Sequence, residues 1–168
     1  ISRGLVGSEM CIRDRRVTDT ETMNIVEMVL SGNVNKNIVQ AINNQDGRAV
    51  GISGKDAKLI TCSQDKPELG LVGSPKDVNP EVIFNLFEND MIPVIAPLGA
   101  GVDGETLNIN GDTVSGAIAA ALKADRLLLL TDVSGVQDKD GSIITELDSS
   151  QIKSLSLIHI SEPTRPRL

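Results

Sequence analysis

Apolar side chains recur along the chain at two spacings, and the spacing separates helices from strands. Between residues 19 and 42 they repeat every three to four positions, which is typical of a helix packed on one face. Residues 31–33, Ser-Gly-Asn, are expected to divide this stretch into two helices. Three further helices are expected, one after Pro80, one over residues 112–122 and one near Asp148. The helix over residues 112–122 consists of small residues that are apolar almost all round, so it is expected to be buried.

Two short and fully apolar runs, residues 92–96 and 127–130, predict strands buried inside a parallel sheet. Residues 49–52 and 58–62 predict two further strands. Residues 63–77 are polar and indicate a loop, with a short strand at 70–73, and residues 136–145 predict a hairpin. The alternation indicates an α/β fold with an open, mainly parallel sheet sandwiched between helices. We expect 92–96 and 127–130 to lie side by side, joined by the intervening helix as a right-handed crossover.

The composition narrows the possible functions. The net charge of −7 at pH 7 argues against a nucleic-acid-binding surface. With two Phe, no Tyr and no Trp, base-stacking platforms and aromatic cages are excluded. One His cannot build a multi-His metal site, and two Cys make no disulfide framework, which favours a reducing, cytoplasmic setting. No apolar run is long enough to span a membrane.

The two ends of the chain resemble translated sequencing-adapter DNA. Residues 5–15 and 155–166 can be written with codons that make the two DNA segments complementary, which is not expected of two natural termini. We therefore expect residues 1–15 and 155–168 to be adapter-derived, and residues 16–154 to be a domain fragment truncated at both ends. Ends of this kind are expected to make few buried contacts and to be the first parts that a protease removes.

Candidate chemistry gathers where strands are expected to end. Ligands of open α/β sheets bind outside the carboxyl ends of the strands, and both apolar strands of the expected parallel pair end in glycine-containing turns. Asn108, Asn110 and Asp112 stand at the start of a helix, where backbone N–H groups favour an anion. On spacing alone, a plain helix cap is the simpler explanation of Asp112, and Asp132 is also explained as a turn residue.

A second candidate, Gly54-Lys55, suggests a phosphate-binding P-loop. That motif needs a Gly separated by four residues from the Gly-Lys pair, and a Ser or Thr after the Lys. The chain has Ala49 and Asp56 at these two positions, so the P-loop interpretation fails.

Seven motifs in order resemble the acetylglutamate kinases of the amino-acid kinase family. No single motif decides the match, but their order and spacing over residues 16–150 are specific. The motifs are Arg16-Val17-Thr18, Val34-Asn35-Lys36, Gly51-Ile52-Ser53-Gly54-Lys55-Asp56, Val78-Asn79-Pro80 and residues 92–99, 107–112 and 129–135. The resemblance implies an amino-acid kinase-like fold and transfer of phosphate from ATP to the side-chain carboxylate of N-acetyl-L-glutamate, in arginine biosynthesis. It also implies Mg²⁺ bridging the phosphates.

The resemblance also implies roles for particular residues. Arg16, Asn108 and Asn110 would bind acetylglutamate, and Asp112 would organise two catalytic lysines. The residues implied in ATP binding are Thr131, Asp132, Val133, Ser134, Gly135, Val136 and Gln137. No protein side chain is implied as a metal ligand. The enzyme would be cytoplasmic and a homo-oligomer, with no nucleic-acid or membrane partner.

Departures from the family pattern limit what the chain is expected to do alone. Gly111 stands where the family commonly has Ala, and no lysine here matches either catalytic lysine, so we expect this chain by itself to be inactive. Two alternatives stay open. One is a sister carboxylate kinase, such as an aspartokinase or a carrier-bound aminoadipate kinase. The other is a non-catalytic domain of the same fold.

Overall fold

The computed structural model describes residues 11–12, 15–130, 143–148 and 150–151. They belong to two compact units, residues 1–127 and 128–168, and the elements below lie in the first. The ends expected to be adapter-derived, the hairpin at 136–145 and the last helix lie wholly or mainly outside the described residues. In the second unit, the carboxylate of Asp148 accepts hydrogen bonds from Ser150 and Gln151, and these bonds lower the pKa of Asp148.

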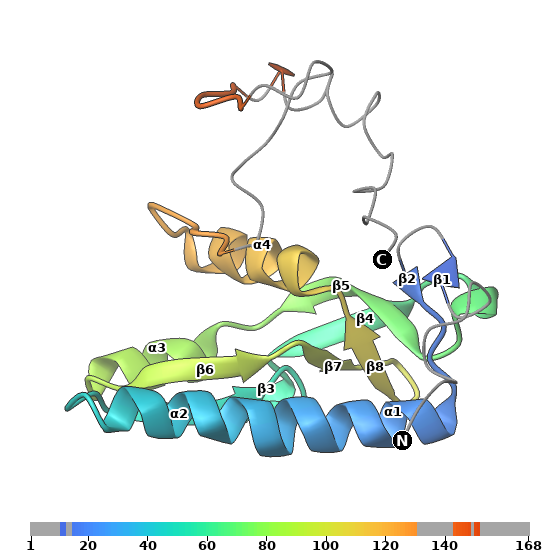
Figure 1. Ribbon diagram of the computed structural model, residues 1–168, viewed down its shortest axis with the longest axis horizontal. Coiled ribbons are helices and arrows are strands. Elements are labelled where there is room, and N and C mark those ends of the chain that lie inside the picture. Colours follow the sequence, from blue (N-terminus) through green and yellow to red (C-terminus); the bar gives the residue numbers. More distant parts are fainter. Residues whose placement is uncertain (1–10, 13–14, 131–142, 149, 152–168) are drawn as a thin grey trace, which may run out of the picture. The chain divides into compact units, whose positions relative to one another are not determined.

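One long helix runs along one side of the first unit (Figure 1). It consists of α1 (Thr20–Glu27), the π-helix η1 (Met28–Val34) and α2 (Asn35–Asn43). Asp19 caps it by accepting a 2.7 Å hydrogen bond from the Thr22 amide, which lowers the pKa of Asp19. The expected break at residues 31–33 is wrong. The chain takes a wider turn there, in which the amide of Asn35 bonds to the carbonyl of Leu30, and the helix continues.

A parallel pair of strands, β3 (Ala49–Ser53) and β6 (Ile92–Ala96), lies beside α2. Both strands were expected, and their parallel pairing agrees with the expected mainly parallel sheet. The expected burial of residues 92–96 is wrong, because only Ala96 of β6 is buried and Ile92 is 46% exposed. Asn35, which is buried in α2, donates hydrogen bonds to the carbonyls of Ile52 in β3 (3.3 Å) and Val94 in β6 (2.8 Å). This side chain fixes the helix against both strands.

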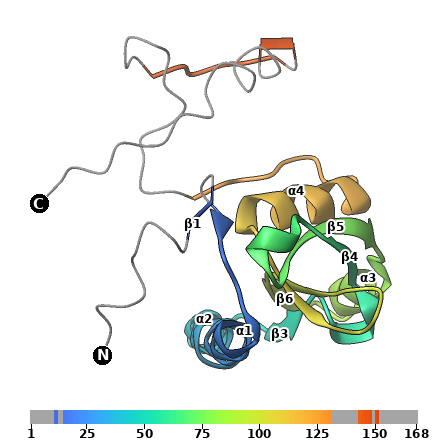
Figure 2. The ribbon, with the colours of Figure 1, turned by 90° about the vertical axis from the view of Figure 1, so that its right-hand side faces the viewer.

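Four further strands close into a small barrel, seen in Figure 2. In barrel order they are β4 (Ile60–Gln64), β5 (Val72–Val78), β8 (Thr106–Ile109) and β7 (Leu98–Ala100). The inner core consists of Leu59, Ile60, Cys62, Ile83, Leu107, Ile109 and Val114. The loop expected over residues 63–77 is wrong for β5, a strand with a polar sequence. Only its first two residues are buried, and it is held by backbone pairing to β4 and β8.

Two helices pack near the strands, α3 (Glu81–Glu88) and α4 (Gly111–Leu122) (Figure 1). The short elements that remain are β1 (Cys11–Ile12), β2 (Arg15–Arg16), η2 (Asp56–Lys58) and η3 (Pro67–Leu69). The apolar sequence of α4 suggested burial almost all round, but only Val114 of this helix is buried. The helix covers the barrel with one side, so its other small residues stay partly exposed. No described helix is both long and apolar enough to cross a membrane.

The strand expected over residues 127–130 is wrong. These four leucines form no strand, and their side chains are between 44% and 98% exposed. The expected neighbour, β6, is paired within the described residues only with β3. An apolar run becomes a strand only where a neighbour accepts and donates its backbone hydrogen bonds, and none of the residues that the structure describes pairs with this run. Within the described residues, α4 therefore does not connect two parallel strands as expected.

Cys62 gives the barrel a testable dependence on pH. Its side chain is fully buried, and burial, assisted by the negative charge of Glu105, raises the pKa of the thiol from 9.0 to about 11. The fold therefore favours the neutral thiol, while the unfolded thiol ionises from about pH 9. We expect the stabilisation from Cys62 to be complete below pH 9 and to be lost as the pH rises toward 11.

Urea unfolding of the chain between pH 8 and pH 11 checks this expectation. Cys62→Ala is the matched control, because it lacks the thiol but keeps every other group that titrates in this range. The stability difference between the two chains should shrink with rising pH. A difference that stays constant from pH 8 to 11 would contradict the assignment.

Candidate functional site

The start of α4 carries the two asparagines and the aspartate that the sequence singled out. Asn110 is the residue that caps the helix: its side-chain oxygen accepts hydrogen bonds from the amide (3.0 Å) and hydroxyl (3.1 Å) of Thr113. The plain-cap explanation of Asp112 is therefore wrong. Asp112 lies in the first turn with an exposed side chain, and its carboxylate makes no hydrogen bond or ion pair within the described part of the chain. It is a negative charge at the positive end of a helix, free to meet a cation.

Asn108 lies in β8, two residues before the helix cap. Its neighbours in the strand, Leu107 and Ile109, are buried in the barrel, so the side chains of Asn108 and Thr106 lie on the opposite, outer face. The backbone amide of Asn108 donates a 2.9 Å hydrogen bond to the carbonyl of Leu71. The strand thus holds the Asn108 amide side chain, half-buried, just before the start of α4.

The segment after Arg16 reaches the same place through the backbone. Arg16 ends β2, which pairs with β1, and its side chain is not among the described parts. Two residues later, the carbonyl of buried Thr18 accepts a 2.6 Å hydrogen bond from the amide of Leu71, whose own carbonyl accepts from Asn108. Gly70 allows this approach, because it has a φ of +67° and a Cβ there would collide with the carbonyl of Thr18.

The structure therefore brings part of the expected site together. Asn108, Asn110 and Asp112 follow one another from β8 into α4, and a single residue, Leu71, links their strand to the segment after Arg16. The expected ATP-binding segment, residues 131–137, lies outside the described residues.

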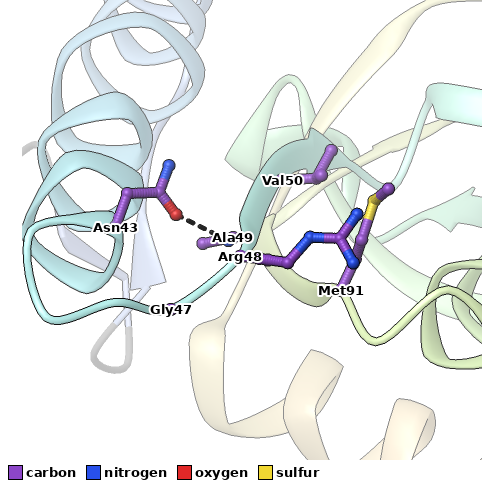
Figure 3. A pocket seen from close by; sticks show the side chains of 6 residues that line it. All are labelled: Asn43, Gly47, Arg48, Ala49, Val50 and Met91. Carbon is purple, nitrogen blue, oxygen red and sulfur yellow. Dashed lines mark hydrogen bonds between the residues drawn. The ribbon is translucent and has the colours of Figure 1, made fainter.

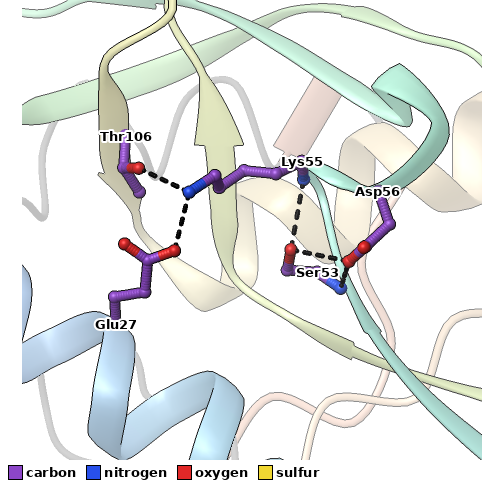
Figure 4. A network of polar contacts seen from close by, with 5 residues as sticks. All are labelled: Glu27, Ser53, Lys55, Asp56 and Thr106. Atoms are coloured by element: carbon purple, nitrogen blue, oxygen red, sulfur yellow. Dashed lines mark hydrogen bonds and ion pairs between the residues drawn. The ribbon is translucent and has the colours of Figure 1, made fainter.

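A polar network beside this site was not predicted (Figure 4). The ammonium of Lys55 donates to the carboxylate of Glu27 in α1 (2.7 Å) and to the hydroxyl of Thr106 in β8 (2.8 Å). From the sequence, Lys55 belongs to a failed P-loop and to one of the seven family motifs, and neither implies a contact for its side chain. The available signal was the Ser53-Gly54-Lys55-Asp56 turn, since a Ser and an Asp three residues apart can close such a turn.

A closed turn presents Lys55 to its partners. The carboxylate of Asp56 accepts hydrogen bonds from the amide (2.7 Å) and the hydroxyl (2.9 Å) of Ser53, and the Ser53 hydroxyl accepts in turn from the amide of Lys55 (3.3 Å). Ser53 is the last residue of β3, so this turn follows the carboxyl end of a parallel strand, where ligands of α/β sheets bind.

The pocket in Figure 3, of about 290 Å³, lies at the opposite, amino end of the parallel strands. It is lined by Asn43, Gly47, Arg48, Ala49, Val50 and Met91. Its polar groups have structural partners, because Asn43 accepts from the amide of Ala49 (2.7 Å) and Arg48 donates to the carbonyl of Asn89 (3.0 Å). We therefore do not count it as the site. Among the described residues, no three His, Cys, Asp or Glu side chains come close enough to hold a metal ion.

Comparison with known proteins shows which proteins the chain resembles. Residues 2–162 match the model of the amino acid kinase family. The chain is 62% identical over 144 residues to the acetylglutamate kinase of Ruegeria pomeroyi, covering 86% of this chain and 50% of the relative. It is 63% identical over 145 residues to that of Roseobacter denitrificans, with the same coverage. The chain thus spans about half the length of these curated relatives.

Solved structures show the same fold. The crystal structure of smu.665 from Streptococcus mutans matches with a TM-score of 0.81 at 30% identity, over 89% of this chain and 61% of that one. An N-acetylglutamate synthase from Neisseria gonorrhoeae, complexed with coenzyme A and N-acetyl-glutamate, matches with a TM-score of 0.71 over 88% of this chain and 34% of that one. At 23% identity, the second match concerns the fold alone. With a family model that matches almost its whole length, the chain belongs to the amino acid kinase family.

Proposed function

We propose that this chain is the acetylglutamate-binding part of an enzyme that phosphorylates the side-chain carboxylate of N-acetyl-L-glutamate with ATP. The observation that carries the proposal is the succession of Asn108, Asn110 and Asp112 from β8 into α4, tied through Leu71 to the segment after Arg16. The acetylglutamate kinase relatives, at about 60% identity, favour this substrate over those of sister carboxylate kinases.

The proposed reaction needs no nucleophile from the protein. A carboxylate oxygen of the substrate attacks the γ-phosphorus of ATP, the bond from that phosphorus to the β–γ bridging oxygen breaks, and ADP leaves. The product is an acyl phosphate. The protein has to bring two anions together and neutralise their charge, so positioning and cations do most of the work.

In this proposal, the substrate is held by the residues around β8. Arg16 would bind a carboxylate with two parallel hydrogen bonds, and Asn108 would donate from its side-chain amide. The structure narrows the role of Asn110: because its oxygen caps α4 by accepting from Thr113, only its NH₂ group is available to the substrate. Asp112 would not touch the substrate but would fix the two catalytic lysines, which match no lysine of this chain.

The nucleotide would lie over the start of α4. A Cβ at Gly111 would meet no atom within 4 Å, so there is open space at the first turn, where backbone N–H groups favour a phosphate. We propose that Thr131, Asp132, Val133, Ser134, Gly135, Val136 and Gln137 contact ATP. Mg²⁺ would neutralise the phosphates and be held mainly by their oxygens. We also propose that the enzyme is cytoplasmic and homo-oligomeric, and that residues 1–15 and 155–168 contribute nothing to it.

A full-length hybrid tests the proposal. In it, the 144-residue segment of this chain replaces the matching segment of the Ruegeria pomeroyi relative. We expect ATP consumption by the hybrid to require acetylglutamate and not to occur with aspartate, and the 168-residue chain alone to give none. Consumption with aspartate would support a sister kinase. A hybrid that folds but is inactive, beside an active relative, would indicate a non-catalytic domain.

A further inference from the structure

We propose that Lys55 is a positioning residue for the acetylglutamate site: its ammonium ties the end of α1 to β8, the strand that carries Asn108. The expected effect of Lys55 on substrate binding rests on the proposed function, whereas its expected effect on the rigidity of β8 does not. The family motif that contains Lys55, residues 51–56, implies no contact between this residue and the substrate.

The first step of the argument is the reach of the Lys55 side chain. It starts in the turn after β3 and joins two elements distant in sequence, through Glu27 in α1 and Thr106 in β8. The turn that presents Lys55 is itself closed by the bonds between Ser53 and Asp56. The Lys55 side chain is therefore fixed at both ends, at its backbone by the closed turn and at its ammonium by Glu27 and Thr106.

The second step is the position of its partners relative to the site. Thr106 and Asn108 lie on the same outer face of β8, two residues and about 7 Å apart along the strand. At the other end of α1, Thr18 is tied to Asn108 through Leu71. Helix α1 is thus fixed to β8 at both of its ends, and the Lys55 bridge is the tie at the end far from Arg16.

The third step is a comparison of magnitudes. The side chains of Lys55 and Glu27 are each 36% exposed, and ion pairs with that much solvent contribute about 0–1 kcal/mol to stability. A contact that stabilises so little can still set the direction in which a strand presents a side chain. Small displacements of positioned groups cost far more in function than in stability. We therefore expect the effect of Lys55 in substrate binding rather than in thermal stability.

The kinetic test uses the full-length hybrid with three substitutions. Lys55→Met removes the bridge, Thr106→Val removes only the hydroxyl with almost the same shape, and Thr106→Ser restores the hydroxyl. We expect Lys55→Met to raise the KM for acetylglutamate about tenfold, equivalent to ~1.4 kcal/mol, with less than a threefold change in kcat or in the KM for ATP. Thr106→Val should follow in the same direction, and Thr106→Ser should recover most of the loss.

Lys36→Met is the matched control. Like Lys55, Lys36 links two elements, because its ammonium donates a 2.9 Å hydrogen bond to the carbonyl of Gly51 in β3. Unlike Lys55, it does not reach β8. Its removal should leave the KM for acetylglutamate unchanged. An equal rise in KM for both lysine variants would overturn the proposal, and so would a rise with Lys55→Met but none with Thr106→Val, which indicates direct contact with the substrate.

Hydrogen exchange in the 168-residue chain gives a readout that needs no activity. Lys55→Met should speed exchange of the backbone amides of β8, including Asn108, more than Lys36→Met does. If the hybrid shows no acetylglutamate-dependent activity, the proposed function fails while this structural result still decides the role of Lys55. Unchanged exchange in β8 would refute the tie itself.

Discussion

Replacing Asp112 with Asn in the full-length hybrid is expected to lower kcat by about 100- to 1,000-fold, while the KM for acetylglutamate stays within about threefold of the original. The variant keeps the size of the side chain and removes its charge. In the structure this carboxylate is exposed at the first turn of α4 and makes no interaction within the described residues. Its proposed partners are the two catalytic lysines. Their positive charge is needed when the substrate carboxylate and ATP come together, so the loss should appear in kcat.

The size of the loss separates a catalytic role from a structural one. A carboxylate in the first turn of a helix contributes about 0.3–1 kcal/mol to stability, so the Asn variant should stay folded. Asp125→Asn is the matched control, because Asp125 is also exposed and follows the other end of α4. It should retain full turnover. Full activity in Asp112→Asn would reduce that residue to a favourable helix charge.

Replacing Gly54 with Ala is expected to reduce the free energy of unfolding of the chain by about 3 kcal/mol. Gly54 is buried in the turn after β3, and a Cβ there would collide with the backbone carbonyl of Leu98. It would also come within 2.6 Å of the Cδ1 of Ile60. A carbonyl in a paired strand cannot rotate away, so β3 and β7 would have to separate. Urea unfolding of the two chains measures the loss.

Gly116→Ala is the control for this substitution. Gly116 lies inside α4, where a Cβ would meet no atom within 4 Å. Ala is favoured over Gly inside a helix by about 1 kcal/mol, so this variant should gain stability. The same chemical change thus has opposite signs at the two positions. A Gly54→Ala chain as stable as the original would mean that the turn is not packed against β7 as described.

Strong apolar patterns in the sequence predicted the helices and strands that carry one apolar face or one continuous apolar run. Helix α3 and the strands β3 and β6 follow from their own sequences, because α3 has apolar residues at helical spacing and the two strands are short apolar runs. β5 could not be predicted in this way, because its sequence is mostly polar and backbone pairing to β4 and β8 holds it in the barrel. β8 does bury Leu107 and Ile109, but two alternating apolar residues are too short a pattern to predict a strand. The run at residues 127–130 shows the converse: an apolar sequence that pairs with none of the described residues forms no strand.

The candidate site shows the same division. The segment from Asn108 to Asp112 could be predicted as a candidate site, because its polar residues come just before a helix. The side chain that caps the helix could not be predicted, because it depends on the backbone conformation. Asn110 has the extended conformation of a cap, with φ −63° and ψ 132°, and this excludes Asp112. Lys55 contacts Glu27, which lies 28 positions earlier in the chain, and Thr106, which lies 51 positions later. No local sequence pattern covers such separations.

The most direct test of the proposed function is the chemical identity of the product. An acyl phosphate reacts with hydroxylamine to form a stable hydroxamate, so the full-length hybrid is incubated with ATP, Mg²⁺, acetylglutamate and hydroxylamine, and the product is identified by mass spectrometry. We expect the side-chain hydroxamate of acetylglutamate in an amount equal to the ADP formed, and none without the hybrid. ADP formed without this hydroxamate, or a hydroxamate formed from aspartate in its place, would contradict the assignment of the carboxylate that receives the phosphate.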